Sequence, residues 1–114
     1  MSDCLFCKIR DGQIPSKMVL EDEQCFAFRD LHPQAPTHVL VVPRRHIATL
    51  NDLVPEDEAL VGHLFTAAAR IARDEGHAQD GWRALFNVNR AGGQLVFHIH
   101  LHVLGGRQLE WPPG

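Results

Sequence analysis

Apolar residues recur along this chain with two different periods, and each period predicts a different kind of element. In residues 55–76 (PEDEALVGHLFTAAARIARDEG) they recur every three or four positions, which predicts an amphipathic helix that packs on a core. A proline suits its first position, three acidic residues complement the positive end of the helix dipole, and Gly76 is a suitable stop. The expected apolar stripe comprises Leu60, Val61, Leu64, Phe65, Ala68, Ile71 and Ala72.

Elsewhere the apolar runs are short and rich in β-branched and aromatic residues, which predicts strands. Residues 18–30 (MVLEDEQCFAFRD) indicate a hairpin across an acidic turn, and residues 38–42 (HVLVV) a central strand. Residues 82–88 (WRALFNV) and 97–104 (FHIHLHVL) predict two more strands. Near the N-terminus, residues 4–9 (CLFCKI) predict one short helical turn that ends in the break GQIPSK.

This order of elements, with its short connections, predicts an α+β domain that spans residues 1–114. We expect a five-stranded antiparallel sheet with a long helix and a short N-terminal helix on one face. A chain of 114 residues with 45% hydrophobic and 22% charged residues is an ordinary single globular domain.

Charge and hydropathy exclude several function classes. The net charge is −3 and no basic run occurs, so nucleic acid is not an expected partner. No apolar stretch approaches 18 residues and no signal peptide opens the chain, which predicts a cytoplasmic protein without a membrane partner. Three cysteines, an odd number, favour a reducing compartment over a disulfide framework.

The last predicted strand carries an unusual set of side chains, because His98, His100 and His102 alternate with apolar residues. Alternate side chains of a strand point to opposite faces, roughly 6.5–7 Å apart along each face. One face would therefore meet the long helix and the other would carry a row of imidazoles. This row is compatible with a solvated face, with a metal site, or with phosphate chemistry by a neutral imidazole nucleophile.

The loop before this strand favours phosphate chemistry. Residues 89–94 (NRAGGQ) contain two glycines, which allow close backbone approach and free N–H groups to bind an anion. Taken alone, the loop is better explained as a plain hairpin turn. Next to three histidines, it would supply hydrogen-bond donors beside a nucleophile.

The motif HIHLHVL (98–104) matches the His-x-His-x-His pattern of the histidine triad (HIT) superfamily. The stretches IPSK (14–17), DLHPQAPTHVLVVPRRHI (30–47) and GGQLVFHIHLHVLGGRQLEWPPG (92–114) resemble its Hint branch, the nucleoside phosphoramidases. The resemblance extends from about Leu5 to Gly114. It implies a HIT-like fold whose sheet is extended across a homodimer.

The resemblance also implies the reaction and the residues that perform it. A Hint-like enzyme cleaves the P–N bond of purine nucleoside 5′-phosphoramidates through a nucleotidyl-histidine intermediate and releases the nucleoside monophosphate. His100 is then similar to the nucleophile, His102 to the residue that contacts the phosphate and the leaving group, and His38 to a fourth histidine that orients the triad. His98 completes the catalytic set.

The same resemblance implies a nucleotide site. The apolar wall of the family's nucleoside pocket is matched here by Phe6, Ile9, Phe28 and Leu31. For the first three of these residues, core packing is the plainer explanation. Asp30 is similar to the carboxylate that binds the ribose, and it shares a strand face with Phe28. The remaining expected contacts are Asn87, Gly93 and Gln94 at the phosphate, and Trp111 from the partner subunit's C-terminal segment.

Two further features concern metal and leaving group. Cys4 and Cys7 form a C-x₂-C zinc half-site, which by resemblance to bacterial HIT relatives is completed by His46 and His98 as a structural zinc site. Cys25 has no partner in this scheme and is expected in the core.

The position of Leu95 is a departure from the family pattern. Animal Hint proteins carry serine there, and leucine cannot donate a hydrogen bond to a leaving group.

Two other functions remain open at this point. A dinucleoside polyphosphate hydrolase of the Fhit branch would use the same chemistry. A nucleotide-binding interaction module with little catalysis is an alternative of another class. A nucleotidyl transferase is disfavoured, because transferase branches carry glutamine in place of the third histidine, and here that residue is His102.

Overall fold

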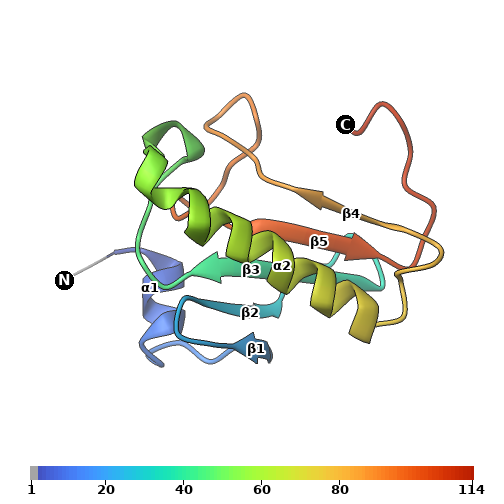
Figure 1. Cartoon of the computed structure of the whole chain (residues 1–114), viewed down its shortest axis with the longest axis horizontal. Coiled ribbons are helices and arrows are strands. Elements are labelled where there is room, and N and C mark those ends of the chain that lie inside the picture. The colour runs from blue at the N-terminus through green and yellow to red at the C-terminus, as the bar shows by residue number, and fades with distance from the viewer. Residues whose placement is uncertain (1–2) are drawn as a thin grey trace.

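The computed structural model describes residues 3–114 and confirms the α+β prediction. Five strands form one antiparallel sheet in the order β1-β2-β3-β5-β4 (Figure 1). Within the described part of the chain, no helix is long and apolar enough to cross a membrane. The elements are α1 (Leu5–Arg10), β1 (Met18–Glu21), β2 (Cys25–Arg29), β3 (Thr37–Pro43), the 3₁₀ turns η1 (Leu50–Asp52) and η2 (Pro55–Asp57), α2 (Glu58–Asp74), β4 (Trp82–Leu85) and β5 (Leu101–Gly105).

Helix α2 lies diagonally across one face of the sheet, as its apolar stripe predicted (Figure 1). It begins three residues later than expected, because residues 55–57 form the 3₁₀ turn η2. Gly76 follows its end with a left-handed φ of 88°, a conformation that glycine adopts without strain. Phe65 departs from the expected stripe, since it is 45% exposed and its ring contacts Phe86. The buried residues of α2 are Leu64, Ala67, Ala68, Ile71 and Ala72.

Helix α1 covers the opposite face of the sheet, so the expectation of both helices on one face is wrong. Phe6 and Ile9 of α1 pack with the side chains of β2 and β3 that point away from α2. Strand alternation explains this arrangement, because β2 and β3 are apolar on both faces and each face needs a cover. The second core comprises Phe6, Ile9, Phe26, Phe28, Leu40 and Val42.

The two C-terminal strands are shorter than predicted. β4 ends at Leu85, and β5 begins only at Leu101, so that His98 and His100 precede the strand. The reason lies outside the sheet, since the N–H of Ile99 donates to the carbonyl of Ile47 instead of to a neighbouring strand. The predicted alternation nevertheless holds, because Ile99, Leu101 and Val103 are all buried in the core beneath α2.

Candidate active site

Sheet pairing brings together histidines that are far apart in the sequence. β3 and β5 pair so that His38 faces Leu104 and Leu40 faces His102. This diagonal arrangement places His38 and His102 on one face, with His38 Nε2 and His102 Nδ1 2.9 Å apart. The rings of His100 and His102 lie 4.9 Å apart between centroids. Three of the predicted catalytic histidines therefore form one contiguous group on the face that α1 partly covers.

The hydrogen bond of His100 defines its reactive atom. Its Nδ1 lies 2.8 Å from the carbonyl oxygen of His98, and because a carbonyl only accepts, this nitrogen carries the proton. In a neutral imidazole the other nitrogen, Nε2, then has a free lone pair. The ring of Phe6 packs against the imidazole in an edge-to-face geometry, with 4.9 Å between centroids. His100 is thus held as a neutral ring with Nε2 available to attack.

A second chain of hydrogen bonds assigns the opposite tautomer to His102. The backbone N–H of Gln34 donates to His38 Nδ1 at 3.0 Å, which leaves the proton of neutral His38 on Nε2. That proton is donated to His102 Nδ1, so His102 carries its own proton on Nε2. His102 Nε2 is buried and has no hydrogen-bond partner within residues 3–114. A buried donor without a partner is costly, and a substrate oxygen or nitrogen would satisfy it.

Burial keeps these imidazoles neutral. It lowers the pKa of His102 to about 4 and also lowers the pKa of His38 and His100. At His100 the hydrogen bond to the carbonyl of His98 partly offsets the effect of burial. At His38 the neighbouring Asp30, whose Oδ2 is 3.5 Å from Nε2, acts in the same offsetting direction. All three rings are therefore uncharged at neutral pH, as the tautomer assignment requires.

The glycine loop before the triad differs from a ready-made anion nest. The N–H groups of Gly93 and Gln94 donate within the loop, to the carbonyls of Arg90 and Asn89. The buried amide of Gln94 also holds the loop, because its Nε2 donates to the carbonyls of Ala48 and Val96. The two predicted phosphate contacts thus shape the loop in this structure.

Gly92 allows a close backbone approach in the same loop, because its α-carbon lies against the backbone of Val88. A Cβ at this position would lie 2.4 Å from the carbonyl oxygen of Val88, a contact that only glycine avoids. Asn87, the third predicted phosphate contact, is half-buried at the start of this connection. The loop is therefore tightly folded next to the histidines.

The predicted nucleoside residues fall into two groups. Phe6, Ile9 and Phe28 are buried in the second core, where Phe6 also touches His100. Asp30 follows β2, is half-buried and lies beside His38. In contrast, Leu31 is 84% exposed and Trp111 is 83% exposed. The structure thus brings Phe6 and Asp30 to the histidines and leaves Leu31 and Trp111 in solvent.

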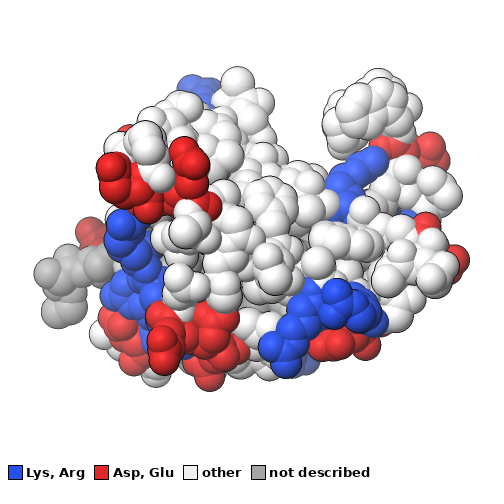
Figure 2. Space-filling view, in the orientation of Figure 1, with Lys and Arg blue, Asp and Glu red and all other residues white. Residues whose placement is uncertain are grey.

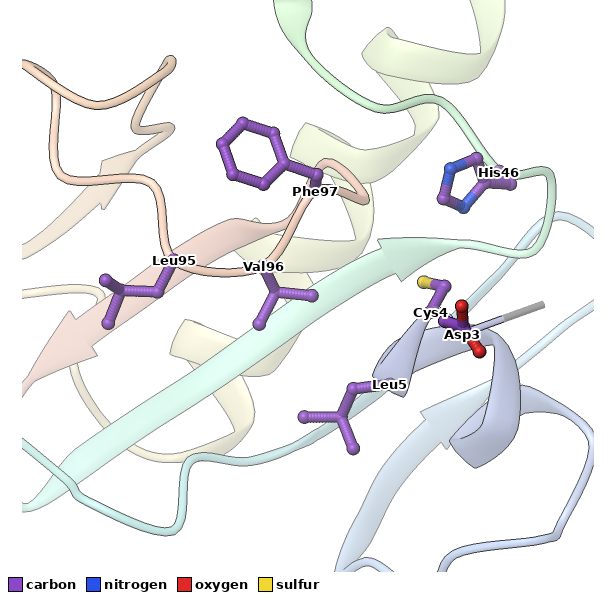
Figure 3. Close-up of a pocket in the computed structure, with 7 residues that line it drawn as sticks. All are labelled: Asp3, Cys4, Leu5, His46, Leu95, Val96 and Phe97. Carbon is purple, nitrogen blue, oxygen red and sulfur yellow. The ribbon is translucent and has the colours of Figure 1, made fainter.

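A hollow of about 470 Å³ lies between the start of α1 and the segment that leads to His98, and Cys4 and His46 of the expected metal site line it (Figure 3). Leu5 and Val96 face each other across it, and Leu95 lies at its rim (Figure 3). Sequence reasoning singled out neither Leu5 nor Val96, although the expected zinc site already brought the neighbouring Cys4 and His98 together. The lining residues are Asp3, Cys4, Leu5, His46, Leu95, Val96 and Phe97.

The four side chains of the expected metal site converge at this end of the molecule. His98 Nδ1 lies 3.3 Å from Cys4 Sγ, 3.5 Å from Cys7 Sγ and 3.2 Å from His46 Nδ1. All four donor atoms lie within 4.8 Å of one another. His98 Nε2 donates to the carbonyl of Pro43 at 2.8 Å, which leaves its Nδ1 lone pair for a ligand. Two sulfurs and two imidazole nitrogens at these distances fit a tetrahedral zinc ion.

This arrangement separates the first histidine from the other two. His98 points toward the cysteines, whereas its backbone carbonyl holds the ring of His100. Burial lowers the pKa of His98 to about 4, so it too is a neutral ligand. Of the four predicted catalytic histidines, His98 therefore contacts His100 through its backbone, while its ring faces the cysteines.

Comparison with known proteins agrees with the motif and the fold. Residues 11–109, which include all three triad histidines, match the HIT domain. A purine nucleoside phosphoramidase of Escherichia coli is 50% identical over 107 residues, which cover 94% of this chain and 90% of that protein. An uncharacterized HIT-like protein of Synechococcus elongatus is 49% identical over 112 residues, covering 98% of this chain and 97% of that one.

Solved structures show the same likeness in three dimensions. A HIT family hydrolase from Legionella pneumophila has a TM-score of 0.97 and 54% identity, and the match covers 98% of this chain and 100% of that one. A histidine triad protein from Clostridium difficile has a TM-score of 0.93 and 43% identity, with 96% of each chain covered. Sequence, fold and the arrangement of the histidines lead to one conclusion: this chain belongs to the HIT family.

Proposed function

We propose that this protein is a nucleotide hydrolase that cleaves the P–N bond of purine nucleoside 5′-phosphoramidates and releases the nucleoside monophosphate. The observation that carries this proposal is the pair of complementary imidazoles. His100 Nε2 offers a lone pair, and His102 Nε2 offers a buried N–H without a partner among the described residues. The 50% identity to the Escherichia coli purine nucleoside phosphoramidase supports the substrate class.

The reaction proceeds in two displacements. His100 Nε2 attacks phosphorus, a P–N bond to the imidazole forms, and the P–N bond to the amine breaks as the amine takes up a proton from water. His102 keeps its proton and donates a hydrogen bond from Nε2–H to the phosphoryl group and the departing nitrogen, where negative charge develops. Water then attacks phosphorus, the bond to His100 breaks, and the proton of the water is released.

The remaining residues bind and orient the nucleotide. Asp30 lies beside His38 and accepts hydrogen bonds from the ribose hydroxyls. Phe6, Ile9 and Phe28 form a rigid apolar floor, and Leu31 provides an exposed apolar contact for the base. Asn87, Gly93 and Gln94 shape the loop against the phosphate. The nucleotide itself thus meets polar groups at one end and apolar groups at the other.

Turnover of adenosine 5′-phosphoramidate by wild type and by His100→Ala tests the proposal. The variant should lose on the order of 10³-fold or more in turnover while it still binds adenosine monophosphate. A variant that keeps near-wild-type turnover would overturn the mechanism. Faster cleavage of a dinucleoside polyphosphate than of the phosphoramidate would instead assign the alternative hydrolase, and binding without any turnover would assign an interaction module.

Cys4, Cys7, His46 and His98 hold a structural zinc ion in this proposal. When bound, the ion would fasten the start of α1 to the segment that carries the triad, because Cys4 and Cys7 belong to α1 and its cap. His98 would then hold its carbonyl in place for the ring of His100. The metal's role is positional, and the displacement is performed by the imidazoles.

The protein acts as a cytoplasmic homodimer whose sheet continues across β4. β4 is an edge strand, and edge strands present unpaired backbone groups. Figure 2 shows a broad area without charged side chains across the face that α2 covers, and Phe65 and Val54 are exposed. The carbonyl of Glu110 accepts from the side chain of Arg83 in β4, and this contact of the C-terminal segment with the edge strand supports a Trp111 that reaches a partner's site.

A further inference from the structure

A second group of metal-ligating side chains lies outside the triad and the Cys4–Cys7 cluster. Asp22 is in the turn between β1 and β2, Cys25 is the first residue of β2, and His63 is in α2. The early part of α2 and this turn lie toward the same end of the molecule (Figure 1). Cys25 is fully buried, as expected of a core residue, but its thiol faces a carboxylate.

The three donor atoms converge on one point. Asp22 Oδ2 lies 2.7 Å from His63 Nε2 and 3.7 Å from Cys25 Sγ, and all three atoms lie within 4.8 Å of one another. The other carboxylate oxygen, Oδ1, accepts from the backbone N–H groups of Gln24 and Cys25, each at 2.8 Å. These two bonds orient the carboxylate and leave Oδ2 directed at the sulfur and the imidazole.

The charges around this group suit a divalent cation. The carboxylate of Asp22 accepts from the two backbone N–H groups and lies 2.7 Å from His63 Nε2, which are contacts that stabilise its negative charge. Arg44 is the nearby cation, and its charge is partly offset by Glu21, 3.4 Å away. A carboxylate and a thiolate together balance a charge of +2. Sulfur and imidazole donors favour zinc-like ions over magnesium or calcium, which prefer oxygen donors alone.

We propose that Asp22, Cys25 and His63 form a second metal site, which takes one zinc-class divalent ion with water as the fourth ligand. On binding, a metal–sulfur bond forms and the thiol proton of Cys25 passes to solvent. The ion replaces the direct hydrogen bond between Asp22 and His63 and fastens α2 to the β1–β2 turn. The site is separate from the triad, so its function is to stabilise the fold.

The small number of cysteines makes this site testable by spectroscopy. The chain has three cysteines, so Cys4→Ser/Cys7→Ser leaves Cys25 as the only thiol. Cobalt(II) added to this double variant should give a thiolate-to-cobalt charge-transfer band that saturates at one equivalent. Adding Cys25→Ala should abolish the band, His63→Gln should weaken binding about tenfold or more, and the exposed control His32→Gln should change nothing.

A second measurement covers the case in which the double variant does not fold. Zinc per chain is counted by native mass spectrometry in the wild type and in Cys25→Ala/His63→Gln, both of which keep Cys4 and Cys7. We expect two ions in the wild type and one in the variant. An equal zinc count in both proteins, or a folded double variant without a thiolate band, would overturn the proposal.

Discussion

At the scale of single residues, the protonation of His100 links burial to activity. Only the neutral imidazole can attack phosphorus, and burial lowers the pKa of this ring. A lowered pKa means that the neutral form persists as the pH falls below the ordinary histidine value of about 6.5. An unperturbed histidine would instead lose its neutral form near pH 6–6.5.

We expect the acid limb of kcat/KM to fall at a pH clearly below 6.5, because the buried His100 protonates late. The measurement is a pH–rate profile with adenosine 5′-phosphoramidate. In Phe6→Leu the aromatic ring that covers His100 is lost, and the limb should move upward by a few tenths of a pH unit or more. A wild-type limb at or above 6.5 would contradict this account.

His38 acts through His102, and its contribution is the direction of one hydrogen bond. Because Gln34 N–H occupies Nδ1 of His38, the ring must donate from Nε2 to His102. His38→Leu should lower kcat about tenfold or more with little change in KM. His38→Gln should recover much of that loss, since an amide N–H can take the place of Nε2–H. Equal kcat values for both variants would show that the hydrogen bond from residue 38 to His102 does not determine kcat.

At the scale of elements, the position of α1 decides how the triad is built. The helix has only six residues, too few to be stable alone, so tertiary contacts must hold it. Its Phe6 and Ile9 cover the second core, and Cys4 and Cys7 meet His98. Loss of these contacts would free both α1 and the segment that carries His98 and His100.

Removal of zinc from the Cys4–Cys7 site should therefore lower thermal stability more than it alters the chemical step. We expect a chelator to lower Tm by at least about 5 °C in Cys25→Ala/His63→Gln, in which only this site remains. Calorimetry with and without chelator measures the effect. The matched variant Cys4→Ser/Cys7→Ser cannot hold this zinc, so it should melt at a lower temperature before any chelator is added. Chelator should cause no further loss of stability through the Cys4–Cys7 site. An unchanged Tm in the first variant would argue against a structural metal there.

At the scale of the whole molecule, the proposed homodimer is supported by an exposed aromatic side chain near the C-terminus. Trp111 is 83% exposed, and the carbonyl of the preceding Glu110 accepts a hydrogen bond from the side chain of Arg83 in β4. A large aromatic side chain suits an interface, and the prolines that follow it restrict the tail. The same region contains the unpaired edge of β4.

Deletion of residues 109–114 should leave a folded protein with altered preference among leaving groups. The effect should be severalfold and greatest for bulky amines, which would touch Trp111 of the partner subunit. Steady-state kinetics with a series of amine leaving groups measures it, and sedimentation at micromolar concentration measures the dimer. A monomeric wild type, or unchanged selectivity after deletion, would contradict the proposed arrangement.

The sequence by itself determined the elements whose signal is local. The 3.6-residue period predicted α2, and the alternation of Ile99, Leu101 and Val103 predicted which side of the last strand faces the core. The histidines of the motif at 98–104 matched the histidine triad pattern, and the resemblance that they carry, together with the stretches around them, implied the chemistry. These signals are readable because helix and strand geometry repeat every few residues, so neighbours along the chain suffice to reveal them.

Only the tertiary structure decided which nitrogen of each triad histidine carries the proton. His98 meets Cys4, 94 residues away, and His102 meets His38, 64 residues away. The tautomer of His38 depends on a backbone N–H of Gln34, which no side-chain pattern reveals. Such partners, and the burial that lowers each pKa, are set by which segments the folded sheet brings together. Three identical side chains therefore differ in their surroundings: His98 faces the cysteines, His100 keeps its proton on Nδ1, and His102 keeps its proton on Nε2.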